Sequence, residues 1–453
     1  MIGSMADNLL DLPSTALRES LASGAVSAEQ LTEASLHRIS KRDGEIGAFL
    51  HVDREFALSE ARARDARRQS GQPIGPLHGL PVGIKDIIDT ADLPTENGTP
   101  IDERRRPSRD AWVVERLRAA GAVIIGKTAT TELAYFSPAG TRNPHDTSRT
   151  PGGSSSGSAA AVAAGMLPLA VGTQTNGSVI RPAAFCGVVG FKPTFGLIPR
   201  TGILRQSELL DTVGVFARSV ADAAMLAETL QGADPGDTST RQRPPIPMLA
   251  DALSDPPVKP AFALVRSPRR ALLTPDADAA FSELAESLGE NCDHVELPDI
   301  FEHAFDAHRK LMLAGFAYNL KRYGERGDGR LSARMQQALA EGQDIRAHEY
   351  LAALEWRQAL KAGLARIFER YDAILTPAAP GIAPLFEQGT GDPSFCTIWT
   401  LCGAPSMTLP LLVDEQGMPI GVQLVGANAD DGRLLRTANW LAQKIQEADA
   451  TAT

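Results

Sequence analysis

The first part of the chain carries apolar residues at helical spacing. A capping-box pattern begins at Ser27, and Leu31 and Ile39 follow it on one helix face. Residues 53–68 are rich in Ala and Arg, which also favours a helix. We therefore expect a mainly helical N-terminal region over residues 10–70.

Beyond this region, short apolar runs alternate with helical patterns. Strands are predicted at 80–84, 122–125, 167–171, 411–413 and 420–425, and helices at 110–120, 158–166, 219–231 and 432–445. Strands that alternate with helices indicate an α/β fold with a parallel or mixed sheet. Residues 75–230 would form its core, and residues 270–370 a variable, mainly helical insertion. Because the chain shows no internal repeat and no clear linker, we expect one domain over residues 1–453.

Composition and charge narrow the classes of function. Of the 453 residues, 43% are hydrophobic and 22% are charged, which is the balance of a folded globular protein. The net charge of -10 gives no general attraction to nucleic acid or anionic lipid, so neither is expected as a partner. We expect a small-molecule substrate and a monomeric or homodimeric protein.

The N-terminus, cysteines and histidines bear on compartment and cofactors. Residues 1–13 lack a basic stretch followed by an apolar one, and no apolar run reaches the ~18 residues that would span a bilayer. The four cysteines form no CxxC pair, and the eight histidines form no HExxH motif. The sequence predicts a cytoplasmic protein that uses no metal and no cofactor.

Two stretches rich in Gly and Ser, residues 150–157 and 172–178, flank one predicted helix–strand unit. Such turns expose backbone N–H groups and hydroxyls, which suits binding of an anion or a developing oxyanion. The first stretch matches G-x-S-x-G by letter, but a nucleophile elbow needs a buried strand before it, and residues 145–151 are polar. A phosphate loop would need a lysine after the glycines, and an Ala-rich helix follows too closely for a flexible linker.

These stretches belong to a longer, ordered set of motifs. The set lies at 79–86, 126–128, 152–155, 177–178, 182–183, 186–187, 190–194 and 417–423. It resembles the motifs of the amidase signature family, and the resemblance extends over about residues 20–445. The nearest resemblance is to free-standing bacterial amidases of the malonamidase, aryl acylamidase and urethanase type. It implies an α/β/α sandwich with a large mixed β-sheet core flanked by helices.

The resemblance also implies a Ser–cisSer–Lys catalytic triad. Ser178 would be the nucleophile, Ser154 the bridging serine in a cis peptide bond, and Lys85 the base. The residue types fit these roles, because a serine hydroxyl needs a base and burial after an apolar strand would lower the pKa of Lys85. Ser154 can donate and accept a hydrogen bond, so it can relay a proton. Gly153 is expected beside the substrate.

The turn before the nucleophile is the expected oxyanion hole. The backbone N–H groups of Thr175, Asn176, Gly177 and Ser178 would face the developing negative charge. Two residues depart from the commonest family pattern, since Gln174 replaces an Asp and Asn176 replaces a Gly. Asn tolerates a left-handed backbone, so the turn keeps its expected role.

A shifted arginine is a further departure. Arg181 stands one position later than in the common pattern, an arrangement similar to the malonamidase-like branch, where the arginine binds a substrate carboxylate. The alternative is a structural role, in which Arg181 pairs with a nearby carboxylate and orders the loop. Tyr135 and Phe136 are expected to line the acyl pocket or, equally, to pack in the core.

The resemblance therefore implies a serine hydrolase that cleaves the C–N bonds of linear amides through an acyl-enzyme on Ser178. Carbamates (urethanes) and aryl esters share the carbonyl geometry and are alternative substrates. A second hypothesis is the amidase subunit of an amidotransferase complex, which acts only with partner chains. A third, a non-catalytic binding module, is disfavoured because Lys85, Ser154 and Ser178 are all present.

Overall fold

The computed structural model of the chain describes residues 9–265, 267–327 and 329–452. The N-terminal segment considered for the compartment lies mostly outside these ranges. Within them, no helix combines the length and the apolar character needed to cross a bilayer.

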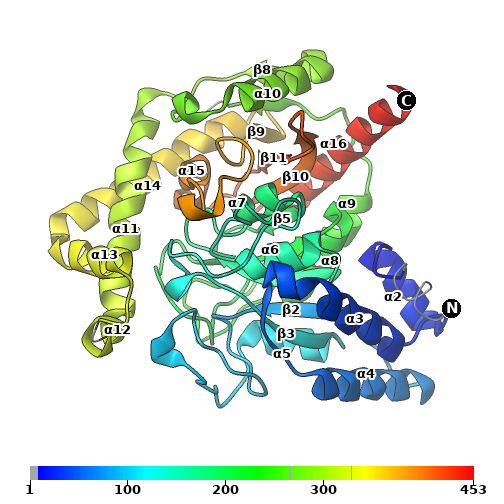
Figure 1. The fold of residues 1–453 in the computed structure, drawn as a ribbon. Coiled ribbons are helices and arrows are strands. Elements are labelled where there is room, and N and C mark those ends of the chain that lie inside the picture. The colour runs from blue at the N-terminus through cyan, green and yellow to red at the C-terminus, as the bar shows by residue number, and fades with distance from the viewer. Residues whose placement is uncertain (1–8, 266, 328, 453) are drawn as a thin grey trace.

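One mixed sheet runs through the described part of the molecule (Figure 1). Its strands are β1 (Phe49–Val52), β2 (Pro81–Lys85), β3 (Val123–Thr128), β4 (Leu169–Gln174), β5 (Val189–Lys192), β6 (Thr212–Ala217), β7 (Phe262–Leu264), β8 (Cys292–His294), β9 (Ala373–Pro377), β10 (Ser406–Val413) and β11 (Pro419–Val425). Their spatial order is β1-β3-β2-β4-β6-β5-β10-β11-β9-β7-β8. Strand β2 runs parallel to β3 and β4, whereas β4 pairs antiparallel with β6 and β10 antiparallel with β11.

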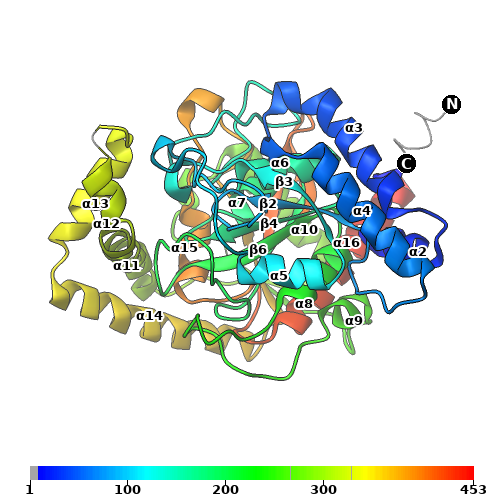
Figure 2. The ribbon, with the colours of Figure 1, turned by 90° about the horizontal axis from the view of Figure 1, so that it is seen from below.

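Helices cover both faces of this sheet. They are α2 (Ser14–Ser23), α3 (Ala28–Ile46), α4 (Arg54–Gln69), α5 (Trp112–Ala119), α6 (Ser156–Ala163), α7 (Ile180–Cys186), α8 (Val220–Leu230), α9 (Met248–Leu253), α10 (Pro275–Leu288), α11 (His303–Asn319), α12 (Lys321–Arg326), α13 (Ala333–Asp344), α14 (Ala347–Phe368), α15 (Ser394–Leu401) and α16 (Asp431–Ala452). Figure 2 shows α6 and α7 on one side of the central strands and α5 and α8 on the other. The predicted α/β/α sandwich with a mixed sheet is confirmed.

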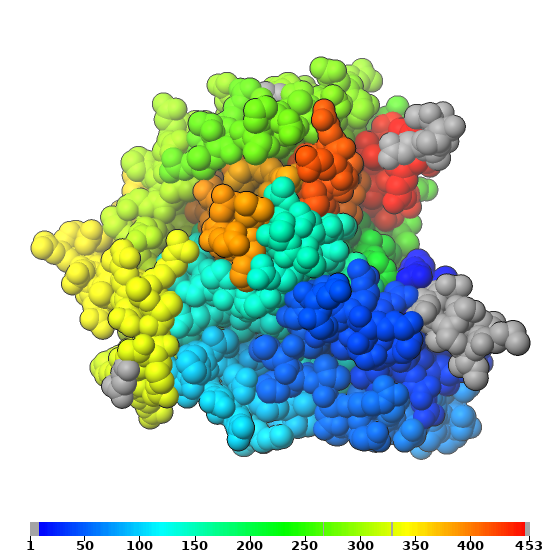
Figure 3. Space-filling view, viewed as in Figure 1, coloured from blue at the N-terminus to red at the C-terminus, as the bar shows by residue number. Residues whose placement is uncertain are grey.

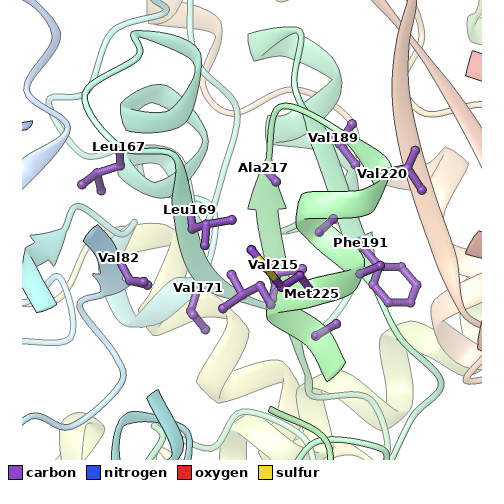
Figure 4. Close-up of a cluster of buried hydrophobic side chains, with 14 of the residues drawn as sticks. Val82, Leu167, Leu169, Val171, Val189, Phe191, Val215, Ala217, Val220 and Met225 are labelled. Carbon is purple, nitrogen blue, oxygen red and sulfur yellow. The ribbon is translucent and has the colours of Figure 1, made fainter. Parts of the chain in front are cut away.

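Side chains of the central strands alternate between the two faces. Leu169 and Val171 of β4 pack in the main apolar cluster with Met225 of α8 (Figure 4). Ala170, which lies between them, and Phe216 of β6 belong to a separate cluster formed with α6 and α7. Because successive strand residues point to opposite faces, both faces are buried here, and the strand ends are where polar groups can meet.

The elements expected from the pattern are all present, with shifted ends. The strand expected at 411–413, for example, begins at Ser406. Residues 10–70 are mainly helical, as expected, but they also hold one strand that the pattern did not predict. Residues Phe49–Val52 form β1, which pairs antiparallel with β3. Four residues are too few for a strand period to stand out beside two long helices.

Helices α11 to α14 lie together on one side of the molecule (Figures 1 and 2). Figure 3 shows them, in yellow-green and yellow, as a projecting part at the left. Helix α11 packs against α13, α14 and α15. This packing brings a side chain of α11 to the sheet edge described next.

Candidate active site

Two parallel strands end side by side where the predicted catalytic residues gather. Strands β2 and β4 pair with Ile84 opposite Val171, so their carboxyl ends share one edge of the sheet. Lys85 is the last residue of β2. Its Nζ donates to Thr173 Oγ1 at 2.9 Å and to Ser154 Oγ at 2.8 Å. The structure therefore brings Lys85 and Ser154 together from distant parts of the sequence.

The Lys85 amine is held away from water. Its side chain has no exposed surface, and this desolvation holds the pKa of Lys85 well below its usual range. The buried carboxyl of Asp211 acts in the opposite direction but more weakly. A lysine that is neutral near physiological pH can accept a proton, which is what a general base requires.

Ser154 is fixed from both sides of its peptide bond. The Gly153–Ser154 bond is cis, as the family resemblance implied. Arg181 Nη2 donates to the Gly153 carbonyl at 2.8 Å, and the Thr131 N–H donates to the Ser154 carbonyl at 3.3 Å. A Cβ on Gly153 would lie 2.9 Å from Thr131 Cγ2 and 3.0 Å from Thr390 Cγ2. The backbone at Gly153 is thus packed too closely for a side chain.

The expected oxyanion turn lies between β4 and α7. The N–H groups of Asn176, Gly177 and Ser178 make no hydrogen bond with the described residues. A Cβ on Gly177 would lie 3.1 Å from Cys396 Sγ, so this residue also passes close to its neighbour. Ser178 is 9% exposed, so a part of this residue remains accessible. The turn can therefore offer free donors next to a serine hydroxyl.

Helix α15 holds this turn in place through two threonines that the sequence analysis missed. Thr400 Oγ1 donates to the Asn176 carbonyl at 2.5 Å, and Thr397 Oγ1 donates to Asn176 Oδ1 at 2.9 Å. Gln174 Nε2 in turn donates to Thr400 Oγ1 at 2.9 Å. The i, i+3 spacing of the threonines places both on one helix face, but only the fold shows that this face meets Asn176.

Gln174, which departs from the family pattern, caps α7. Its Oε1 accepts from the N–H groups of Val179 at 2.8 Å and Ile180 at 3.0 Å. These donors would otherwise be unpaired at the start of the helix. The substitution therefore keeps a capping acceptor beside the nucleophile without a carboxylate charge.

Thr175 is held by side chains from two other segments. Its Oγ1 lies 2.7 Å from Asp211 Oδ1 and 2.6 Å from Gln206 Oε1. His308 Nε2, from α11, lies 2.9 Å from the Thr175 carbonyl. Burial lowers the pKa of His308 to about 4, so the ring is neutral and its Nε2 carries the hydrogen that the carbonyl accepts. His308 was not predicted, since a lone histidine in a helix gives no signal.

We expect Thr400→Val to lower kcat about tenfold with little change in KM. The valine keeps the shape of the side chain but removes the donor that positions the Asn176 peptide, so the loss should fall on transition-state stabilisation. Thr397→Val is the matched control, because Thr397 bonds to the side chain of Asn176 rather than to its backbone and should cost less than about threefold. Steady-state kinetics of both variants test this, and equal losses in the two variants would contradict it.

Arg181 is buried and bonds to the protein's own backbone. It is 2% exposed, and its Nη1 donates to the Gly391 carbonyl at 2.6 Å while its Nη2 donates to the Gly153 carbonyl. Desolvation lowers the pKa of Arg181 to about 10, which still leaves it charged at neutral pH. These contacts favour the structural alternative, with carbonyls rather than a carboxylate as partners.

We therefore expect Arg181→Met to lower the activity toward neutral and acidic amides by the same factor, and to destabilise the fold by about 1–3 kcal/mol. The variant leaves the buried Gly153 and Gly391 carbonyls without their donor. Parallel kinetics on a neutral and an acidic amide, with denaturant unfolding, provide the measurement. A loss confined to the acidic amide, in a protein of unchanged stability, would instead assign Arg181 to substrate binding.

Tyr135 and Phe136 differ in their surroundings. The Tyr135 ring packs edge-on against Phe316, a buried residue of α11, at 5.0 Å between centroids. The Phe136 ring has two guanidinium groups near its centroid, that of Arg181 at 5.6 Å and that of Arg334 at 5.2 Å. Phe136, but not Tyr135, lines a hollow of about 660 Å³. The pocket prediction thus fits Phe136, and core packing fits Tyr135.

This hollow adjoins the site through the segment after residue 389. Gly391 and Pro393 line it, and Gly391 accepts the hydrogen bond from Arg181. The Pro393 side chain also lies against the backbone of Gly177, since a Cβ there would be 3.3 Å from Pro393 Cβ. Phe185 supplies a second aromatic ring to its wall.

Known sequences resemble the chain over most of its length. The profile of the family described as Amidase matches residues 30–435. The A subunit of glutamyl-tRNA(Gln) amidotransferase from Thermobifida fusca is 38% identical over 471 residues, covering 94% of each chain. The protein of the same name from Chloroflexus aggregans is 36% identical over 464 residues, again covering 94% of each chain. These relatives do not establish the expected malonamidase or urethanase subtype.

Solved structures with the same fold cover almost the whole chain. The peptide amidase from Stenotrophomonas maltophilia superposes with a TM-score of 0.85 and 31% identity, over 96% of this chain and 97% of that one. A second structure comes from a vestigial protein complex that bears on the evolutionary origins of an s-triazine catabolic enzyme. It superposes with a TM-score of 0.89 and 31% identity, over 96% of this chain and 98% of that one.

Proposed function

The chain belongs to the amidase family as a serine hydrolase of C–N bonds, and on that premise we propose that Ser178 is its nucleophile, Ser154 its bridging acid–base and Lys85 its base. One observation carries the assignment. The fully buried Lys85 amine donates to Ser154 Oγ at 2.8 Å, at the edge where the next turn presents Ser178. A lysine amine that is fully buried and bonded only to neutral groups is costly without a chemical use, because Lys is ordinarily charged and solvated.

The reaction begins with two linked proton transfers. Lys85 Nζ takes the proton of Ser154 Oγ while Ser154 takes that of Ser178, and Ser178 Oγ bonds to the carbonyl carbon as the carbonyl electron pair moves to oxygen. The tetrahedral intermediate then expels the nitrogen. Ser154 returns its proton to the leaving amine and regains one from Lys85, and water releases the acyl group from Ser178 by the same steps.

The turn that precedes Ser178 stabilises the charge on that oxygen. The N–H groups of Asn176, Gly177 and Ser178 have no other partner among the described residues, and each such donor is worth about 3 kcal/mol in a transition state. Thr400 and His308 hold the flanking carbonyls, so the donors do not need to reorganise during the reaction.

We propose linear amides with an aryl or apolar group as the substrates, hydrolysed by the chain on its own. Phe136 and Phe185 in the hollow beside Gly391 support an apolar substituent. Likeness to the peptide amidase over 96% of the chain supports independent action. Aryl carbamates are the alternative substrates, because their carbonyl presents the same geometry to Ser178.

A hydrolysis screen of the isolated chain tests this proposal. Aryl amides, primary aliphatic amides, acidic amides and aryl carbamates are compared, with Ser178→Ala in parallel. Turnover of aryl amides above the others, absent in the variant, is the expected result. A preference for carbamates would select the alternative substrate class, and turnover that survives in Ser178→Ala would overturn the assignment.

The second candidate is a role as one chain of an amidotransferase. It is favoured by 36–38% identity to the A subunit of glutamyl-tRNA(Gln) amidotransferase over 94% of the chain. This candidate predicts an isolated chain that is silent on all four substrate classes and a partner chain that co-purifies with it from its source.

A further inference from the structure

A basic hollow of about 900 Å³ lies apart from the catalytic residues. Its walls come from the loop after β5, the loop between α8 and α9, helix α14 and the segment before α16. Figure 2 shows α14 and the loop that follows α8 along the same lower side of the molecule. Neither Ser178, Ser154 nor Lys85 lines it, so the proposed reaction does not account for it.

This hollow is positively charged, whereas the protein as a whole is negatively charged. Six cationic side chains line it with a single carboxylate, Glu208, although the chain carries a net charge of -10. Glu208 is paired with Arg205 at 3.4 Å. Arg200 is neutralised by a buried ion pair with Asp237 at 2.8 Å. The other four cations of the hollow are Arg241, Arg243, Arg357 and Lys361.

None of these four side chains forms an ion pair with the described residues, although burial raises the pKa of the Asp431 carboxyl and the charge of Arg243 partly opposes that rise. Arg357 donates its Nε to the Leu401 carbonyl at 2.8 Å, and Arg243 donates to the Gly196 carbonyl at 2.9 Å. Arg241 and Lys361 are exposed and make no ion pair or hydrogen bond with the described residues. Four like charges that converge on one hollow repel one another, and an anion placed among them would relieve that repulsion.

The fold brings these four cations together from two separate segments. Arg357 and Lys361 are four residues apart on α14 and therefore project from one face of the helix. Arg241 and Arg243 face them from the loop between α8 and α9. Burial lowers the pKa of Arg357, which marks its guanidinium as partly desolvated without an anion to compensate.

One aromatic ring, that of Phe195, lines the hollow. The half-buried ring of Phe195 has the Arg200 guanidinium 5.2 Å from its centroid and that of Arg357 5.6 Å away. This arrangement fixes the two arginines and leaves an apolar edge for an organic group. A volume of about 900 Å³ accommodates a small molecule.

From this juxtaposition we propose that the hollow formed by Arg241, Arg243, Arg357 and Lys361 is a binding site for a small molecule that carries several phosphate groups. Arginine forks match phosphate oxygens two at a time, and several converging cations favour a multivalent anion over a monocarboxylate. The net charge of -10 over the whole chain disfavours a long polyanion such as RNA, which would extend beyond the basic walls.

Isothermal titration of the full chain with sodium tripolyphosphate at low ionic strength tests the proposal. We expect one site per chain, whose affinity falls as salt is raised. The double variant Arg241→Glu/Lys361→Glu should weaken binding at least about tenfold, a difference of about 1.4 kcal/mol. Both side chains are exposed, so the fold should tolerate the change. Arg104→Glu, a charge reversal at a side chain that is 88% exposed on another loop, is the matched control and should bind as the wild type does.

Two further titrations identify the ligand chemistry. ATP binding at the same site, with the same loss in the double variant, would place a nucleoside beside Phe195, whereas tripolyphosphate binding without ATP binding would limit the site to bare phosphates. Absence of tripolyphosphate binding, equal binding by the double variant, or binding only of a poly-glutamate peptide would overturn the proposal. Calorimetry needs no turnover, so its result is independent of whether Ser178 is the nucleophile.

Discussion

Replacing Ser178 by alanine is expected to lower kcat/KM on the best amide substrate by a factor on the order of 10⁵. The variant cannot form the acyl-enzyme, and only the oxyanion donors remain to favour attack by water. The Ser178 hydroxyl has no hydrogen-bond partner among the described residues, so its loss should leave the midpoint of thermal unfolding nearly unchanged. Initial rates and a melting curve of the same preparation provide the measurement.

Ser158→Ala is the matched control for this experiment. Ser158 is a buried serine of α6 whose Oγ donates to the Val171 carbonyl at 3.0 Å and makes no hydrogen bond to Lys85. We expect it to cost some stability, about 1 kcal/mol, and less than about tenfold in rate. Equal losses of activity in Ser158→Ala and Ser178→Ala would contradict the assignment, because the loss in Ser178→Ala would then not be specific to the nucleophile.

Replacing Lys85 by methionine is expected to lower kcat by a factor of about 10³ or more, because the variant lacks the base but keeps the volume of the side chain. The wild-type enzyme should lose kcat/KM as pH falls through the pKa of Lys85, since only the neutral amine accepts a proton. That pKa is held well below its usual range by burial, so the acid limb should lie well below pH 10.5. The residual activity of Lys85→Met should lack this limb.

Although Lys85→Met should lower activity, we expect it to raise the stability of the folded protein. A lysine whose pKa is lowered in the folded state binds a proton more tightly when unfolded, so below the usual lysine pKa it costs the fold stability. We expect Lys85→Met to unfold at higher denaturant than the wild type at neutral pH, with an advantage that shrinks as pH rises toward 10.5. Lys127→Met is the comparison, because the pKa of Lys127 is lowered only to about 8 and Asp86 lies 3.3 Å from its amine. Its removal would leave the Asp86 charge unpaired and should destabilise the protein.

The sequence allowed much of the core to be predicted, for reasons visible in particular residues. Runs such as those in β2 and β3 are largely apolar because both faces of the sheet are covered, and that pattern is readable without a fold. Lys85, Ser154 and Ser178 were predicted from ordered motifs, and the structure brings the first two into contact. The short strand β1 was missed because pairing with β3, rather than its own pattern, makes it a strand.

The residues that hold the proposed oxyanion turn could not be predicted in the same way. His308, Thr397 and Thr400 lie far along the chain from Thr175 and Asn176, and their types are ordinary for helices. Only the packing of α11 and α15 against the end of β4 gives them a partner. The choice between two roles for Arg181 was open for a similar reason, since its bond to Gly391 joins segments 210 positions apart.

The central claim is that Ser178 carries the acyl group during turnover. A fluorophosphonate reacts with an activated serine by forming a phosphorus–oxygen bond and releasing fluoride, so the modified residue can be located by mass spectrometry of a digest. The account predicts one adduct per chain on the peptide that contains Ser178, no adduct in Ser178→Ala, and a much slower reaction in Lys85→Met. An adduct on Ser154 in the wild type, or undiminished labelling of Ser178→Ala, would contradict it.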